Sequence, residues 1–114
     1  MHINRNNELE YFTFTIFENK LKHGIFTRKG GVSPSPWNTL NIGGTVGDDQ
    51  ERVIKNRTLM LNALDLDYSK VYECWQVHGN NVITVEEPKD PKTPHIKGDA
   101  IITNNPEVTL LMRF

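Results

Sequence analysis

The feature that most limits the fold is an irregular run from His23 to Asp49, "HGIFTRKGGVSPSPWNTLNIGGTVGDD". This run holds six of the eight glycines and two of the six prolines of the chain. Glycine and proline interrupt helices and strands, so the run has room for only one short predicted strand, Gly24–Arg28. The rest is predicted to be a long structured loop, and loops of this length inside a compact domain are often functional.

Regular elements are predicted on both sides of this loop. Alternating residues in "YFTFTIF" predict a strand over Tyr11–Phe17. Asp48 and Glu51 form a capping-box-like start, and apolar residues at helical spacing then predict a helix over about Gln50–Leu64. Further strands are predicted over residues 71–78, 81–87, 99–103 and 108–114.

The turn Gly79-Asn80-Asn81 is expected to join its two flanking strands as a hairpin, or to lie within one bent strand. Residues 88–98 hold three prolines and predict an exposed loop. The last predicted strand stays apolar up to Phe114. Domains seldom stop inside a buried strand, so the chain is expected to be cut there.

Length and composition favour one domain over residues 1–114, with small molecules or proteins as partners. The 13 basic and 14 acidic residues are scattered, so no one-signed surface is predicted for nucleic acid or a membrane. A single cysteine excludes an internal disulfide, and the first residues lack a secretory signal. A cytoplasmic location is therefore expected. No apolar run is long enough to span a bilayer, so a membrane protein is not expected. The oligomeric state stays open.

The segment "ECWQVHG" places Cys74 and His78 four residues apart. On a helix this spacing can bring both side chains to one metal ion, but the neighbours favour a strand, in which they lie ~13 Å apart. Cys74 is therefore predicted to be a small core residue. His78 is predicted either to project into a cleft at a sheet edge or to hydrogen-bond a turn carbonyl.

The loop segment Thr27–Asn41 combines a strand end, two cations, paired glycines and several hydroxyl groups. Such a loop can present backbone N–H groups and a guanidinium to an anion such as phosphate, although it lacks the spacing of a P-loop. The alternative is an Ω-like surface loop held by turn chemistry, and both stay open. Asp99 in "GDAII" either opens a strand as a turn residue or orients a histidine or arginine, and the turn is favoured.

The order of the motifs is more specific than any one of them. They follow one another as "FTRKGGVS", "LNIGGTVGDD", a helix with "VIKNR", "WQVHG", "GDAIIT" and an apolar strand. In this order the chain resembles the bacterial laccase-domain family, also called multicopper polyphenol oxidoreductase or peptidoglycan editing factor. Members of that family are associated with purine nucleoside phosphorylase activity. The resemblance runs from about Gly24 to Phe114.

The resemblance implies a metal site made by the histidine of Q-V-H-G, the cysteine of a following A-D-C and the histidine of a later H-x-G-W-R-G. His78 matches the first motif, and the other two have no counterpart up to Phe114. Cys74 precedes His78 and cannot stand in for that cysteine. The chain is thus expected to be the N-terminal part of a longer protein. The implied fold is α+β, a mixed β-sheet sandwich with flanking helices, present here as a partial domain.

By the same resemblance, a complete relative binds zinc, with copper as the alternative, and uses phosphate to cleave adenosine, inosine or methylthioadenosine. Adenosine deamination is a further implied activity. Arg28, Gly30 and Gly31 match the family's T-R-x-G-G-V-S segment and are candidate substrate-binding residues, with Asn41 of the L-N motif beside them. A single imidazole competes poorly with water for zinc, so residues 1–114 alone are expected to be inactive.

Two other functions stay open. The first is a stand-alone module that binds an anion or nucleotide at the glycine-rich loop without catalysis. The second is a copper-dependent polyphenol oxidoreductase, which receives less weight because a multicopper oxidase needs many more histidines than the four present. A reading frame that continues into A-D-C and H-x-G-W-R-G favours the phosphorylase, and a stop codon after Phe114 favours the binding module.

Overall fold

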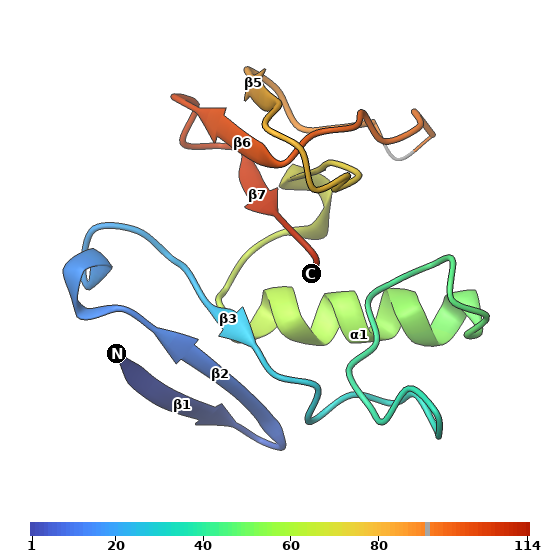
Figure 1. The fold of residues 1–114 in the computed structure, drawn as a ribbon. Helices are drawn as coiled ribbons and strands as arrows, with labels where there is room; N and C mark the ends of the chain where they lie inside the picture. Colours follow the sequence, from blue (N-terminus) through green and yellow to red (C-terminus); the bar gives the residue numbers. More distant parts are fainter. Residues whose placement is uncertain (91) are drawn as a thin grey trace. The chain divides into compact units, whose positions relative to one another are not determined.

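The structure is a computed structural model that describes residues 1–90 and 92–114. The chain divides into two compact units, Met1–Asp65 and Leu66–Phe114, and each is described by itself. Figure 1 traces them from the blue N-terminus to the red C-terminus. Strands and helix are both present, in agreement with the predicted fold class. The prediction of one domain over residues 1–114 stays a prediction, and Pro91 of the predicted loop 88–98 lies outside the described residues.

A three-stranded antiparallel sheet begins the first unit, in the order β1-β2-β3. Its strands are β1 (His2–Asn6), β2 (Leu9–Thr13) and β3 (Ile25–Phe26). Tyr11 of β2 lies opposite Phe26 of β3, and the two rings stack with centroids 4.7 Å apart. Cross-strand aromatic pairs of this kind stabilise a sheet beyond the area that they bury.

The predicted strand Tyr11–Phe17 is wrong in its second half. β2 stops at Thr13, and a short 3-10 turn, η1 (Thr15–Phe17), follows it. Between them the N–H of Phe14 donates to Nε2 of His23 at 2.7 Å, so the backbone here bonds a side chain instead of a neighbouring strand. β1 was not predicted, because its sequence "HINRN" is mostly polar and lies largely exposed.

The predicted helix is confirmed as α1, which spans Gln50–Ala63. Its N-cap differs from the prediction, because the side chain of Asp49 accepts the N–H of Glu51 while Asp48 turns inward. The residues of α1 that lie buried are Val53, Asn56, Met60 and Leu61. With Leu9 and Leu40, which are also buried, these apolar side chains form the core of the first unit.

Asn56 is the polar member of the buried face of α1, and it is 0% exposed. Its Oδ1 accepts the N–H of Val32 at 2.8 Å. Its Nδ2 donates to Oγ of Ser33 at 2.9 Å and to the carbonyl of Asn41 at 2.8 Å. The loop has little secondary structure of its own, so these bonds satisfy its backbone and fasten it to the helix. Figure 1 shows this loop, in cyan to green, running beside α1.

Asp48 forms the second polar anchor of the loop. Its carboxylate accepts hydrogen bonds from the hydroxyl of Ser33, from Nδ2 of Asn41 at 3.1 Å and from the N–H of Asp49 at 2.8 Å. The guanidinium of Arg52 lies 3.8 Å away. Burial raises the pKa of Asp48, but these hydrogen bonds lower it by more, so the pKa lies below its usual value.

The second unit holds two parallel strand pairs. β4 (Val71–Glu73) pairs with β7 (Thr109–Leu111), and β5 (Val82–Val85) pairs with β6 (Ala100–Thr103). A 3-10 turn, η2 (Tyr68–Lys70), leads into β4. The expected hairpin or bent strand at residues 79–81 is wrong, because the strands before and after the turn belong to different sheets. All four strands are shorter than the ranges predicted for them.

A buried carboxylate lies at the end of β4. Glu73 is 2% exposed, and its carboxylate contacts the guanidinium of Arg113 and Nε2 of His95, the latter at 3.5 Å. A buried charge is tolerated when an opposite charge and hydrogen bonds accompany it. β7 ends at Leu111, and Arg113 beyond it supplies this charge.

Replacement of Asn56 tests the fastening of the loop to the helix. We expect Asn56→Ala to lower the free energy of unfolding by about 1–3 kcal/mol for each buried group that loses its partner. Chemical denaturation followed by helical circular dichroism measures the change. Asn62→Ala is the matched control, because Asn62 lies on the same helix and is exposed. Equal losses in the two variants would contradict the role of Asn56.

Acid should loosen the first unit through Asp48. A carboxyl with a lowered folded-state pKa stabilises the fold above its unfolded pKa, near ~4, and this contribution disappears as the pH falls through the folded value. We therefore expect the free energy of unfolding to decrease as the pH is lowered past about 4. In Asp48→Asn this decrease should be less steep. Asp49→Asn is the control, since asparagine caps a helix as well as aspartate does. An unchanged acid slope in Asp48→Asn would disprove this assignment.

Candidate functional site

His78 lies in a turn that follows a paired segment. After β4 the N–H of Trp75 donates to the carbonyl of Ile96 at 2.8 Å, and the N–H of Gly98 donates to the carbonyl of Trp75 at 2.9 Å. Trp75 thereby forms a parallel bridge with Lys97. The predicted strand over residues 71–78 is therefore interrupted at residue 74, and His78 itself stands beyond the bridge.

The backbone of His78 is left-handed, with φ of 59°. This conformation costs about 1–3 kcal/mol for a residue with a side chain, and it persists only where the surroundings enforce it. The residue is exposed, and within residues 1–90 and 92–114 its imidazole ring has no hydrogen-bond or ion-pair partner. The hydrogen bond of this ring to a turn carbonyl, the alternative open from the sequence, is not present among the described residues.

Asp99 holds this turn through the backbone. Its Oδ1 accepts the N–H of Val77 at 3.0 Å, and its own N–H donates to the carbonyl of Asn81 at 2.8 Å. Burial raises the pKa of Asp99, while the N–H groups of Gly79, Val77, His78 and Asn81 lower it by more, so the pKa lies below its usual value. The sequence favoured a turn residue here, and it carried no signal for a contact between residues 22 positions apart.

Cys74 is a core residue, as predicted, and is 3% exposed. Its thiol donates to the carbonyl of Gly98 at 3.2 Å and lies 3.4 Å from the sulfur of Met112. Burial raises the pKa of the thiol, and the nearby carboxylates of Asp99 and Glu73 raise it further. A metal binds the thiolate, so a thiol kept protonated in the core is a poor ligand.

The described residues fit one position of a zinc site. Neutral imidazole is a usual zinc ligand, and the ring of His78 is exposed and unengaged. No group of three or more His, Cys, Asp or Glu side chains among the described residues converges to hold a metal ion. Among the described residues, His78 can therefore serve as one ligand at most of such a site.

Arg28 lies at the start of the glycine-rich loop, and its backbone organises the loop. Its carbonyl accepts the N–H groups of Thr39 and Leu40, each at 2.8 Å. Its Nε donates to the carbonyl of Asn38 at 2.9 Å, and this is the one hydrogen bond of its guanidinium to the described part of the chain. The residue is exposed, so the remaining guanidinium N–H groups are available to an anion.

Gly30 and Gly31 allow the loop to pass close to other backbone segments. Gly30 has φ of 90°, and a Cβ there would lie 2.4 Å from the nitrogen of Leu9. A Cβ on Gly31 would lie 2.2 Å from the carbonyl oxygen of Thr39. No side chain fits at either distance, so both glycines are needed for the loop to close.

Asn41 is engaged inside the same loop. Its Nδ2 donates to the carbonyl of Gly43 at 3.2 Å and to Asp48, and its Oδ1 accepts the N–H of Gly43 at 3.0 Å. The hydroxyls of Ser33 and Thr39 are likewise bonded to loop or helix residues. These contacts agree with the alternative of an Ω-like loop held by turn chemistry. Among the candidate substrate-binding residues, Arg28 is the one whose side chain keeps N–H groups available for a ligand.

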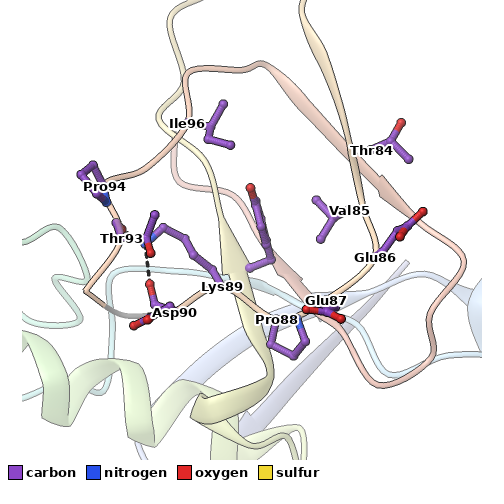
Figure 2. Close-up of a pocket in the computed structure, with 11 residues that line it drawn as sticks. Thr84, Val85, Glu86, Glu87, Pro88, Lys89, Asp90, Thr93, Pro94 and Ile96 are labelled. Carbon is purple, nitrogen blue, oxygen red and sulfur yellow. Dashed lines mark hydrogen bonds between the residues drawn. The ribbon is translucent and has the colours of Figure 1, made fainter.

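Two open pockets lie away from the candidate residues. One, in the second unit, has a volume of ≈ 530 Å³ and is bordered by Val85, Lys89 and Ile96 among others (Figure 2). The ammonium group of Lys89, one of the lining residues, donates to the carbonyls of Asp90 and Thr93. The other, of ≈ 460 Å³, lies in the first unit and is partly lined by histidine and aromatic side chains. None of Arg28, Gly30, Gly31, Asn41 and His78 lines either pocket.

Comparison with protein families decides the relationship. A family model described as multi-copper polyphenol oxidoreductase laccase matches residues 22–114. The chain belongs to this laccase family. The match includes the glycine-rich loop, α1 and the turn that carries His78. It confirms the family to which the order of motifs pointed.

Curated relatives in this laccase family are named as phosphorylases. A purine nucleoside phosphorylase of Streptomyces coelicolor is 42% identical over 81 residues, which are 70% of this chain and 33% of the relative. One of Mycobacterium bovis is 38% identical over 91 residues, which are 80% of this chain and 36% of the relative. The chain thus spans about a third of the length of these relatives.

A solved structure has the same fold. The crystal structure of YlmD from Geobacillus stearothermophilus matches with a TM-score of 0.82 and 25% sequence identity, over 98% of this chain and 44% of that chain. The mixture of sheet and helix seen here is therefore part of the fold of that family member. No helix in the described ranges has the length and apolar character needed to cross a membrane.

The requirement for glycine at position 31 can be measured. We expect Gly31→Ala to lower the free energy of unfolding by about 1–3 kcal/mol, because its Cβ meets backbone that cannot move aside. Gly44→Ala is the matched control, since a Cβ there would lie 3.3 Å from the end of the flexible Gln50 side chain. That variant should stay within about 0.5 kcal/mol of the wild type. Equal stability of both variants would show that the loop does not need this close approach.

Proposed function

We propose that this chain supplies the glycine-rich substrate loop and one zinc ligand, His78, of a purine nucleoside phosphorylase. The observation that carries the proposal is the state of His78, which is exposed, left-handed in its backbone and without a protein partner for its ring among the described residues. An unengaged imidazole on an enforced turn is suited to bind a metal. The family membership and the printed names of the relatives support the choice of reaction.

In phosphorolysis a phosphate oxygen forms a bond to C1′ of the sugar while the C1′–N bond to the base breaks. The electron pair leaves with the base, which then takes up a proton, and the sugar keeps the phosphate. The exposed guanidinium of Arg28 is suited to bind the attacking phosphate, and the Gly30-Gly31 and Asn41 contacts fix the loop that presents it. When bound, zinc supplies a Lewis acid that stabilises developing negative charge.

The resemblance to the family supports a proposal for the substrate and the setting. We propose adenosine, inosine or methylthioadenosine as substrates, zinc rather than copper as the metal, adenosine deamination as a side activity and the cytoplasm as the location. We also propose that the strands form part of a mixed sandwich in the complete protein. The coverage of about a third of the relatives supports the view that the remaining ligands lie outside residues 1–114.

The test compares the product of the complete reading frame with residues 1–114 alone. We expect the first, loaded with zinc, to convert adenosine or inosine and phosphate into free base and sugar 1-phosphate at about 1–10³ s⁻¹. Residues 1–114 should show no turnover. His78→Ala should lower kcat/KM by about 100-fold or more, because the metal site loses a ligand. His2→Ala is the control, since His2 is exposed and lies outside the family match.

Comparable turnover by residues 1–114 would contradict the shared metal site. A second candidate, an anion-binding module, is favoured by the open donors of Arg28. It predicts that residues 1–114 bind inorganic phosphate or a nucleotide without zinc, and that Arg28→Ala abolishes this binding while His78→Ala does not. Nuclear magnetic resonance titration of the chain with phosphate tests this binding. Turnover of the complete product with zinc separates the two functions, because the binding module predicts none.

A further inference from the structure

The turn that carries His78 is held by a side chain from outside it. Asp99 stands directly before β6, and its carboxylate reaches back to the N–H of Val77 at 3.0 Å. The backbone N–H of Asp99 donates to the carbonyl of Asn81 at 2.8 Å. Asp99 therefore hydrogen-bonds the turn on both sides of His78, through its side chain on one side and its backbone on the other.

The turn needs these stabilising hydrogen bonds because its backbone conformation is unfavourable. His78 has φ of 59°, and the turn itself lies exposed with glycine and asparagine following. A free segment of this sequence would populate many other conformations, since no helix or strand includes residues 76–81. A left-handed residue with a side chain persists where surrounding contacts over-determine it.

The carboxylate of Asp99 also lies close against the turn. The second oxygen of Asp99, Oδ2, is buried against Gly79, where a Cβ would lie 3.2 Å from it. The N–H of Val77 is the hydrogen-bond donor from the turn to this carboxylate, and backbone N–H groups of the turn keep the pKa of Asp99 below its usual value. An amide at this position would keep one oxygen but would bring an NH₂ group toward these N–H donors.

We propose that Asp99 is the positioning residue of His78. It fixes where the imidazole stands by accepting the backbone N–H of Val77 on one side of His78 and donating its own N–H to the carbonyl of Asn81 on the other. Asp99 does not touch substrate or metal in this role. The proposal rests on the proposed function in one respect, that the imidazole is a zinc ligand. The alternative, that Asp99 only opens β6 as a turn residue, predicts no effect of its side chain on residues 77–79.

The experiment uses the metal-free and zinc-loaded product of the complete reading frame, with Asp99→Ala and Asp99→Asn as variants. The first readout is amide hydrogen exchange of Val77, His78 and Gly79 without metal. We expect Asp99→Ala to accelerate exchange at Val77 at least about tenfold while β5 and β6 stay protected, with Asp99→Asn intermediate. The second readout is zinc affinity by chelator competition, which should weaken about 10–100-fold in Asp99→Ala.

Asp67→Ala is the matched control, because the Asp67 carboxylate also accepts a backbone N–H, that of Ser69 at 2.8 Å, in the same unit. It should change neither readout. If Asp99→Ala fails to fold, the amide exchange and zinc affinity of Asp99→Asn, which keeps the size of the side chain, test the role of Asp99 instead.

The outcomes separate the two proposals. Unchanged exchange at residues 77–79 in the Asp99 variants overturns the role of Asp99. A second result also overturns it: Asp99→Ala accelerates the exchange but leaves the zinc affinity unchanged, while His78→Ala weakens that affinity. If His78→Ala leaves the zinc affinity of the wild type unaltered, the proposed metal function fails. The exchange readout in the metal-free protein then decides by itself whether Asp99 holds the turn.

Discussion

The side-chain amide of Asn56 is the contact on which the glycine-rich loop depends. A loop with few regular backbone bonds would otherwise leave polar groups unpaired against the helix, and a buried unpaired group is costly. Asn56 and Asp48 both form hydrogen bonds with polar groups of the loop. Gly31 allows two backbone segments of the loop to pass close to each other. The open guanidinium of Arg28 therefore projects from a backbone that is fixed without belonging to a helix or strand.

The same arrangement recurs in the second unit with a charge in place of an amide. The turn around His78 has no regular pairing, and Asp99 supplies the acceptor that a neighbouring strand would otherwise provide. Both candidate regions are thus irregular segments held by polar side chains from elsewhere in the sequence. This arrangement permits an exposed functional group on a fixed backbone within an irregular segment.

Sequence reasoning succeeded where the signal is local. Helical spacing located α1 nearly to its ends, and ordered motifs identified the family. It failed where a partner far away in the sequence determines the structure. The turn after His78 was expected to lie in a hairpin or a bent strand, but its flanking strands pair with other strands. Asp48 was expected to cap the helix, but its carboxylate is buried and bonded to the hydroxyl of Ser33. Asn56 could have been found, since it shares the helical face of Val53 and Met60. The candidate roles of Arg28 and His78 stay predictions, because they concern ligands and not the fold.

The parallel pairing of the second unit also sets an order of events during synthesis. β1 and β2 are adjacent in the chain and can pair as soon as both have left the ribosome. Val71 of β4 finds its partner only at Thr109, and Val82 of β5 waits for Ala100. Contacts this far apart in sequence form slowly, because a long segment must be ordered before they are gained. Until then the apolar residues of β4 and β5 lack the strand partners of the folded unit, so at this stage their unpaired edges are open to wrong pairing.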